Sequence, residues 1–368
     1  MLPIELLLLI AEKNLHSFVA IRSIDRDIRD YTNKHMAKYK ETFSTKIEVK
    51  SEDGREEEYW QLPNGDRHGL YRLWRDSKLL MQCTYVDGRL EGLYQLWVYL
   101  SNSDCKFLKQ YTYVRGRLHG PYQEWYNNGR ENVQLLEQST YLNGELSGLH
   151  QEWHDGVKLS KQYTYHNGKY HGLYQSWHKN GKLNMQCTYF NGEYHGLYQS
   201  WYKDGHPRAI FYYFNGKEEG LYQSWHFNGN FCERSTYFNG KLNGPYQSWY
   251  DNGRLYKRCT YVDGSYEGLY EVWHPNGNLH EQCTYSNNKR EGLYQSWHEN
   301  GLPHHQSTFV EGYITGLYTQ WRLTGRLRSQ WNFKNGERHG LSKEWRQDGT
   351  LSSIDKYDNG KLIWSALF

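Results

Sequence analysis

The stretch NGEYHGLYQSWYKDG, residues 191–205, decides the fold because its central part recurs along the chain. The heptapeptide HGLYQSW at residues 195–201 also stands 24 residues earlier, at residues 171–177. Alignment on the glycine of GLYQSW gives twelve copies, spaced by 24 residues from Gly148 onward. The twelve glycines are Gly69, Gly92, Gly120, Gly148, Gly172, Gly196, Gly220, Gly244, Gly268, Gly292, Gly316 and Gly340. This periodicity indicates a repeat array instead of two or three separate cores.

Each copy carries two turn signals, which indicate two short strands per repeat. Within residues 172–195, Asn180 precedes Gly181 and Asn191 precedes Gly192, with strand-forming residues on either side. Asn-Gly is typical of a two-residue type I′ turn, which needs positive φ at both positions. A turn signal about every ten residues leaves no room for a helical period. We therefore predict a mainly β fold: an elongated, twisted or coiled antiparallel meander of about 24 strands, with a short N-terminal helical segment.

The spacing of the turns also predicts which side chains share a face of the sheet. Tyr174, Ser176 and Cys187 fall on one face, whereas Leu173 and Trp177 fall on the other. Both faces therefore carry aromatic rings, which are the candidate site residues of the array. The members singled out are Tyr174, Trp177, Tyr198, Trp201, Tyr222, Trp225, Tyr246 and Trp249.

The recurrent glycine is predicted to have a packing role. In the register set by Asn191 and Gly192, Gly196 lies directly opposite Cys187. A residue without a side chain at this point leaves a flat spot between neighbouring tyrosines. We interpret the glycine as structural and not as a ligand contact.

Composition and charge exclude several classes of function. The 368 residues include 35 tyrosines and 15 tryptophans, so burial must rest on aromatic side chains. Lysine and arginine number 44 against 41 acidic residues, and the two signs are interspersed. Without a basic stripe, we expect no nucleic acid partner. The apolar run LPIELLLLIA contains Glu5 and follows no basic residue, so we do not expect it to be a secretion signal. No run reaches the ~20 apolar residues of a spanning helix, so we do not expect membrane insertion.

Four of the six cysteines occupy one repeat position, directly before a Thr-Tyr pair: Cys83, Cys187, Cys259 and Cys283. Equivalent residues in successive two-strand repeats lie about 9.5 Å apart. A disulfide tolerates only about 4.4–6.8 Å between Cα atoms. These cysteines are therefore predicted to be small buried residues in a reducing, cytoplasmic environment.

Histidines and serines also follow the repeat, and this argues against a metal or catalytic site. The histidines after tryptophan are His178, His226, His274 and His298. Zinc needs ligand atoms at about 2.0–2.1 Å, which side chains one repeat apart cannot supply alone. No nucleophile, base and orienting group break the repeat symmetry together. We predict interfacial hydrogen bonds for the histidines, and no metal, cofactor or catalytic residue.

The pattern NGKYHGLYQSWHKNGKLNMQCTY, at residues 167–189, resembles the MORN repeat, in the longer variant found in bacterial antitoxin-type proteins and large DNA viruses. The resemblance covers about residues 61–360. It implies an elongated β-meander that contacts proteins or membrane lipids and has no catalysis of its own. Departures are local: His150 and Ser342 stand where Tyr198 has its counterparts, and Asn287 with Asn288 replaces one Asn-Gly pair.

The ends of the chain lie outside this array. Residues 1–40 have helical spacing, and LPIELLLLI resembles the start of an F-box. In that family this segment contacts the Skp adaptor of cullin-type ubiquitin ligases, which by position would involve Leu2, Pro3, Leu6 and Ile10. The alternative is a helical cap for the open sheet edge. Residues 41–60 are expected to form a charged linker and a degenerate capping hairpin, and residues 361–368 a C-terminal cap.

These features favour a non-enzymatic protein-protein interaction protein. With an F-box, it would be a substrate receptor that links a target on the array to a Skp/cullin ubiquitin ligase. Two alternatives remain open: a structural or virion scaffold, and an antitoxin-like or lipid-binding repeat protein. Membrane contact has no support from a polybasic cluster or a lipidation motif. If the protein is viral, we expect it in the host cytoplasm.

Overall fold

The computed structural model describes residue 40 and residues 44–99, 105–127 and 133–368, in two compact units, Met1–Gly181 and Lys182–Phe368. The strands of the first unit are β1 (Thr45–Lys50), β2 (Arg55–Gln61), β3 (Gly69–Arg75), β4 (Lys78–Val86), β5 (Arg89–Leu90), β6 (Gly92–Tyr99), β7 (Cys105–Val114), β8 (Arg117–Leu118), β9 (Gly120–Asn127), β10 (Val133–Leu142), β11 (Glu145–Leu146), β12 (Gly148–His154), β13 (Lys158–His166), β14 (Lys169–Tyr170) and β15 (Gly172–Trp177).

The strands of the second unit are β16 (Leu183–Phe190), β17 (Glu193–Tyr194), β18 (Gly196–Trp201), β19 (Pro207–Phe214), β20 (Lys217–Trp225), β21 (Phe231–Phe238), β22 (Lys241–Leu242), β23 (Gly244–Trp249), β24 (Leu255–Val262), β25 (Ser265–Tyr266), β26 (Gly268–Trp273), β27 (Leu279–Ser286), β28 (Lys289–Trp297), β29 (Pro303–Val310), β30 (Tyr313–Trp321), β31 (Leu327–Lys334), β32 (Glu337–Trp345), β33 (Leu351–Asp358) and β34 (Lys361–Leu367).

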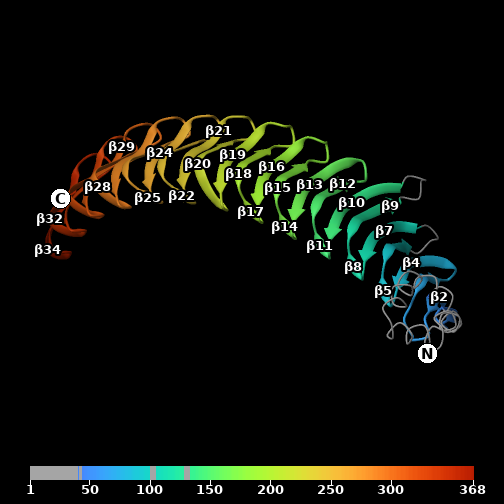
Figure 1. Cartoon of the computed structure of the whole chain (residues 1–368). Coiled ribbons are helices and arrows are strands. Elements are labelled where there is room, and N and C mark those ends of the chain that lie inside the picture. Colours follow the sequence, from blue (N-terminus) through green and yellow to red (C-terminus); the bar gives the residue numbers. More distant parts are fainter. Residues whose placement is uncertain (1–39, 41–43, 100–104, 128–132) are drawn as a thin grey trace, which may run out of the picture. The chain divides into compact units, whose positions relative to one another are not determined.

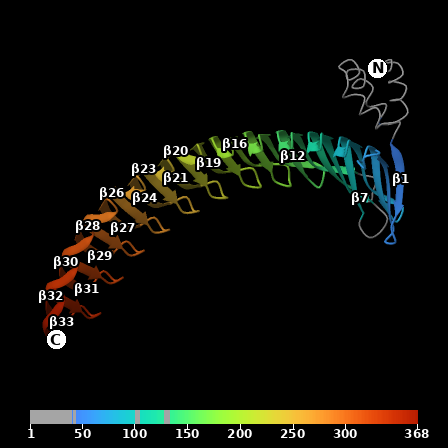
Figure 2. The same ribbon diagram turned by 60° about the horizontal axis from the view of Figure 1, so that its bottom comes forward.

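The predicted β-meander is confirmed in both units. Successive arms of the meander pair antiparallel, as β3 does with β4 and β20 with β21 (Figure 1). Figure 2 shows the same succession of strands from a second direction. The described residues form 34 strands, against about 24 expected. Seven of the additional strands are two-residue strands, such as β17, at the start of a long arm, and the other three are β1, β2 and β34, which lie outside the twelve copies. The predicted N-terminal helix lies outside the described residues.

The two turns of each repeat differ, which the Asn-Gly signal did not distinguish. Asn191 and Gly192 both have positive φ, 52° and 92°, as a type I′ turn requires. Of Asp204 and Gly205, only the glycine does, at 94°. The N–H of Gly205 donates to the carbonyl of Tyr202 at 2.9 Å, and the N–H of Tyr202 donates to the carbonyl of His206 at 2.9 Å. This second turn is therefore a three-residue loop that ends in a left-handed glycine.

The predicted role of Gly196 is corrected by the register. On β16, Tyr189 pairs with Tyr194, but Gln186 pairs with Gln199, so the register shifts by two residues between these pairs. Gly196 therefore does not lie opposite Cys187. Its φ of 94° is the feature that requires glycine, because side chains disfavour this backbone conformation. The repeat keeps its glycine for the backbone bend at the register shift.

The face that carries the tyrosines and cysteines is the buried one, and we call it the tyrosine face. Cys187 and Ser200 on this face are only 1% and 8% exposed. On the opposite face, Leu197 and Phe190 are 46% and 51% exposed. The tyrosine face therefore holds most of the core, although aromatic rings occur on both faces.

Small residues make room for the tyrosine rings. Tyr246 lies directly opposite Cys259, and Tyr222 lies opposite Ser235, which is fully buried. Alternation of large and small side chains across a strand pair fills the space without strain. The five cysteines whose side chains are described are free, and burial raises the pKa of Cys187 to about 12, so this thiol stays protonated at neutral pH.

In the second unit, side chains that follow the repeat tryptophan connect neighbouring repeats. The hydroxyl of Tyr202 donates to the carbonyl of Trp225 at 2.8 Å, and Nε2 of His226 lies 2.9 Å from the carbonyl of Trp249. The prediction that histidines of this position form hydrogen bonds between repeats is confirmed here. Across residues 44–99, 105–127 and 133–368, no helix is long and apolar enough to cross a membrane.

Candidate functional site: a charged rung on the tyrosine face

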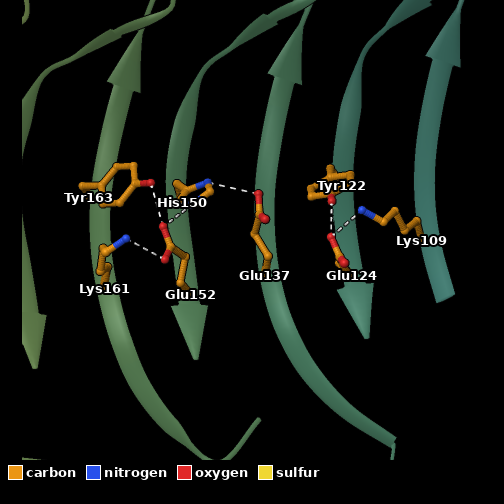
Figure 3. Close-up of polar contacts among 8 residues, drawn as sticks. All are labelled: Lys109, Tyr122, Glu124, Glu137, His150, Glu152, Lys161 and Tyr163. Carbon is orange, nitrogen blue, oxygen red and sulfur yellow. Dashed lines mark hydrogen bonds and ion pairs between the residues drawn. The ribbon is translucent and has the colours of Figure 1, made fainter. Parts of the chain in front are cut away.

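The repeat symmetry of the tyrosine face is broken by a row of charged residues in the first unit. Five directly opposed residues on β7, β9, β10, β12 and β13 form this row, the charged rung. In order across the sheet they are Lys109, Glu124, Glu137, Glu152 and Lys161 (Figure 3). Later repeats place a buried serine at the position of Glu152, for example Ser176 and Ser200.

The two ends of the rung are ion pairs. Nζ of Lys109 lies 2.9 Å from Oε2 of Glu124, and Nζ of Lys161 lies 2.9 Å from Oε2 of Glu152. The hydrogen bond to Glu124 raises the pKa of Lys109. Burial acts to raise the pKa of Glu152, but its polar contacts together lower this pKa, and the hydrogen bond and charge of Lys161 contribute most to the lowering. Both outer carboxylates are therefore held by a cation.

Tyrosine hydroxyls fix the same outer carboxylates. The hydroxyl of Tyr122 donates to Oε2 of Glu124 at 2.8 Å, and that of Tyr163 donates to Oε1 of Glu152 at 3.1 Å. Burial raises the pKa of both tyrosines, which keeps them protonated as donors. The carboxylates are thus oriented by the tyrosine face itself.

The central residue of the rung, Glu137, has no opposing lysine. It lies between Glu124 on β9 and Glu152 on β12. Burial, followed by the charges of these two carboxylates, raises the pKa of Glu137. Three carboxylates therefore face two lysines, and the central one is the least stable as an anion.

His150 completes the cluster beside Glu137. It replaces the repeat tyrosine, is 5% exposed and stacks on the ring of Tyr163 with a centroid distance of 4.4 Å. Nδ1 lies 3.9 Å from Oε1 of Glu137, and Nε2 lies 3.4 Å from Oε1 of Glu152, and neither contact has hydrogen-bond geometry. Burial lowers the pKa of His150, so its ring is uncharged at neutral pH. The ring therefore adds no positive charge to balance Glu137.

This arrangement is suited to bind a cation supplied from outside. An external lysine or arginine beside Glu137 would relieve the repulsion among the three carboxylates and favour the ionised form of Glu137. Among the described residues, no group of three or more His, Cys, Asp or Glu side chains is arranged to hold a metal ion. The rung is thus a candidate contact for a basic side chain.

The aromatic candidates from the sequence are distributed along the array and do not converge on this cluster. Tyr174 borders it, with its ring 5.3 Å from that of Tyr163. Trp225 and Trp249 lie on either side of Phe231, at centroid distances of 5.5 Å each. Tyr198, Trp201, Tyr222 and Tyr246 belong to the second unit. Leu2, Pro3, Leu6 and Ile10 lie outside the described residues.

Sequence reasoning missed the charged rung. The available signal was glutamate in GPYQEW and GLHQEW, at Glu124 and Glu152, where five of the other ten copies have serine. Pairing of these residues with Glu137 became visible only from the strand register.

We expect Glu137→Gln to stabilise the first unit at neutral pH. Because folding raises the pKa of Glu137, its protonated form favours the folded state at a pH below the pKa in the unfolded chain. This contribution to stability is lost as pH rises through the pKa in the folded chain. The variant should therefore gain about 0.5–1 kcal/mol in unfolding free energy at pH 7, allowing for solvent screening at this half-buried site. Urea unfolding at pH 7 and pH 4 measures the difference, which should vanish at pH 4. An equal gain at both pH values would contradict the electrostatic explanation.

Comparison with known proteins supports the repeat assignment. Residues 170–191, 242–263 and 266–287 are similar to the MORN repeat variant. These segments contain the copies of Gly172, Gly244 and Gly268. No curated protein matches the chain. The similarity fits a repeat-type role in protein interaction or binding, in a repeat family that is generally non-catalytic.

Proposed function

We propose that the chain is a non-enzymatic interaction protein that uses the charged rung to hold a basic segment of a protein partner. The observation that carries the proposal is the central position of Glu137, between two carboxylates and without a lysine opposite. A position that serves packing alone would be expected to carry a residue that favours folding. At Glu137, a third carboxylate instead lies beside two others, and their repulsion disfavours folding. A cost of this kind is typical of a binding position.

The surroundings favour a lysine or arginine side chain over a free metal ion. The side chain of Glu137 is 35% exposed, so a basic side chain from a partner can reach it. Tyr122 and Tyr163 are buried and hold Glu124 and Glu152 in place through their hydroxyls, so a guanidinium or ammonium group meets oriented carboxylates.

The experiment measures binding of a fluorescent hexa-arginine peptide by anisotropy at low and moderate salt. We expect the double variant Glu137→Gln/Glu152→Gln to bind about tenfold more weakly than the natural protein. Glu233→Gln is the matched control, because Glu233 lies across from Ser224 at an equivalent repeat position without the flanking carboxylates. Equal binding by the natural protein and the double variant would refute a role of the rung.

The second part of the proposal is that residues 1–40 bind a Skp adaptor, which would make the protein a substrate receptor of a ubiquitin ligase. The F-box-like pattern of Leu2, Pro3, Leu6 and Ile10 supports this second part. Purified Skp adaptor should be captured by the full-length chain and not by a chain that lacks residues 1–40. Capture that survives the deletion, or no capture at all, would remove the ligase role and leave a plain interaction scaffold.

A further inference from the structure

An arginine-lined cavity lies in the second unit, between the ends of the last repeats. Its volume is about 730 Å³, and it is bordered by β30, β31, β32 and the start of β33. Four arginines and one glutamate line it, together with two tryptophans and several uncharged polar residues. The arginines are Arg322, Arg328, Arg338 and Arg346, and the glutamate is Glu344.

Most of the positive charge of this cavity is not neutralised by acidic side chains. Among the residues that the structure describes, no Asp or Glu side chain lies within ion-pair distance of any of the four arginines. Arg346 donates to the backbone oxygens of Leu351 and Phe368. The charges of Arg322, Arg328 and Arg338 therefore have no opposing carboxylate side chain in direct contact. The cavity therefore combines several positive charges with one negative charge.

Arg322 has more N–H donors than the one needed for the contact that this repeat position makes to the next repeat. In the preceding repeat His298 contacts the carbonyl of Trp321 through Nε2 at 3.3 Å. Arg322 makes the equivalent contact to Trp345 with Nη2 at 2.7 Å, while its Nε is buried without a partner. A buried donor without an acceptor is costly, and a ligand that supplies the acceptor would recover that cost.

Arg338 and Arg328 direct further charge into the same region. The guanidinium of Arg338 lies 4.2 Å from the centroid of Trp331 and donates to the hydroxyl of Tyr357 at 3.2 Å, so its orientation is fixed. Arg328 is exposed. Burial, followed by the charges of His304, His298 and Arg328, lowers the pKa of His305 to about 4.

We propose that this cavity binds a ligand that carries phosphate. Guanidinium groups bind phosphate through parallel N–H···O bonds, and several of them can contact one group because phosphate has three acceptor oxygens. A dianionic group also balances more of the excess charge than a carboxylate does. The cavity is larger than inorganic phosphate alone requires, which favours a ligand with more than one phosphate or with a further organic part. This site is distinct from the charged rung, which attracts the opposite charge.

Titration calorimetry with inorganic pyrophosphate tests the proposal on the full chain. We expect binding by the natural protein, and binding that is about tenfold weaker after Arg328→Gln/Arg338→Gln. The single variant Arg328→Gln, at an exposed position, gives a second measurement that does not disturb the contact between Arg338 and Trp331. Arg208→Gln is the matched control, because Arg208 occupies the repeat position of Arg328 five copies earlier and lies beside Tyr202.

The outcomes separate the ligand classes. Absence of pyrophosphate binding, an equal loss in Arg208→Gln, or malonate binding as tight as pyrophosphate would each overturn the proposal. Flotation with vesicles of phosphatidylcholine and phosphatidic acid identifies the source of the phosphate. Flotation that requires Arg328 supports a phosphate on a lipid headgroup, and pyrophosphate binding without flotation supports a soluble phosphorylated ligand.

Discussion

Tyr163→Ala should lower the unfolding free energy of the first unit by about 3–5 kcal/mol, the range for removal of a large buried aromatic side chain. Tyr163 is 6% exposed, and its ring lies 4.4 Å from that of His150 and 5.3 Å from that of Tyr174. It stands where the next repeat has Cys187, and it fills the space that opens because His150 is smaller than the usual tyrosine.

Urea unfolding and hydrogen exchange of the amides in β12 to β15 measure the loss. In repeat proteins, each repeat is stabilised mainly by its neighbours, so exchange should rise first in these strands. Tyr163→Phe is the control, since it keeps the ring and removes only the hydroxyl that donates to Glu152. It should cost about 1 kcal/mol. Equal losses in the two variants would show that the hydroxyl, and not ring packing, stabilises the unit.

Gly156→Ala should lower the unfolding free energy of the same unit by about 3 kcal/mol, from steric overlap and an unfavourable backbone conformation together. A Cβ atom on Gly156 would lie 1.9 Å from Cβ of Gln134 and 2.9 Å from its Cα. Because backbone is involved, a rotamer change of Gln134 cannot remove the overlap. The φ of Gly156 is also positive, at 67°.

Gly144→Ala is the matched control in the same unit. Gly144 has a φ of 97°, and a Cβ there would meet no atom within 4 Å. It should therefore lose only the about 1–2 kcal/mol of the left-handed conformation. Thermal and urea unfolding of both variants give the comparison. If both variants lose the same free energy, the contact with Gln134 relaxes without cost and the steric argument is wrong.

The sequence by itself determined the repeat, its strands and its two faces. These features follow from local chemistry, since Asn-Gly pairs produce turns and residues alternate between faces along a strand. The placement of Cys187 and Leu197 on opposite faces could be predicted from this alternation alone, whereas the structure decided that the face of Cys187 is the buried one. Hydrogen bonding by His226 could be predicted because the same position recurs in copy after copy.

Tertiary structure decided what depends on how neighbouring strands pair. The two turn types, at Gly192 and Gly205, look alike in sequence but differ in φ at the preceding residue. The register shift beside Gly196 arises because the two arms of a repeat have unequal lengths, and it moves Cys187 away from the glycine. The Asn-Gly or Asp-Gly pair determines that a turn occurs, whereas the pairing of the two strands that it joins determines the type of turn.

The same distinction separates the two proposed sites from the sequence that encodes them. Glu124, Glu137 and Glu152 are ordinary surface residues in sequence, and only strand pairing places them in one row. Arg322 and Arg338 are likewise separated along the chain and meet at one cavity. Charge interactions depend on distance and burial, which residue spacing alone does not specify. Sequence therefore determined the repeating strands, and the pairing and packing of those strands decided where charged side chains lie together.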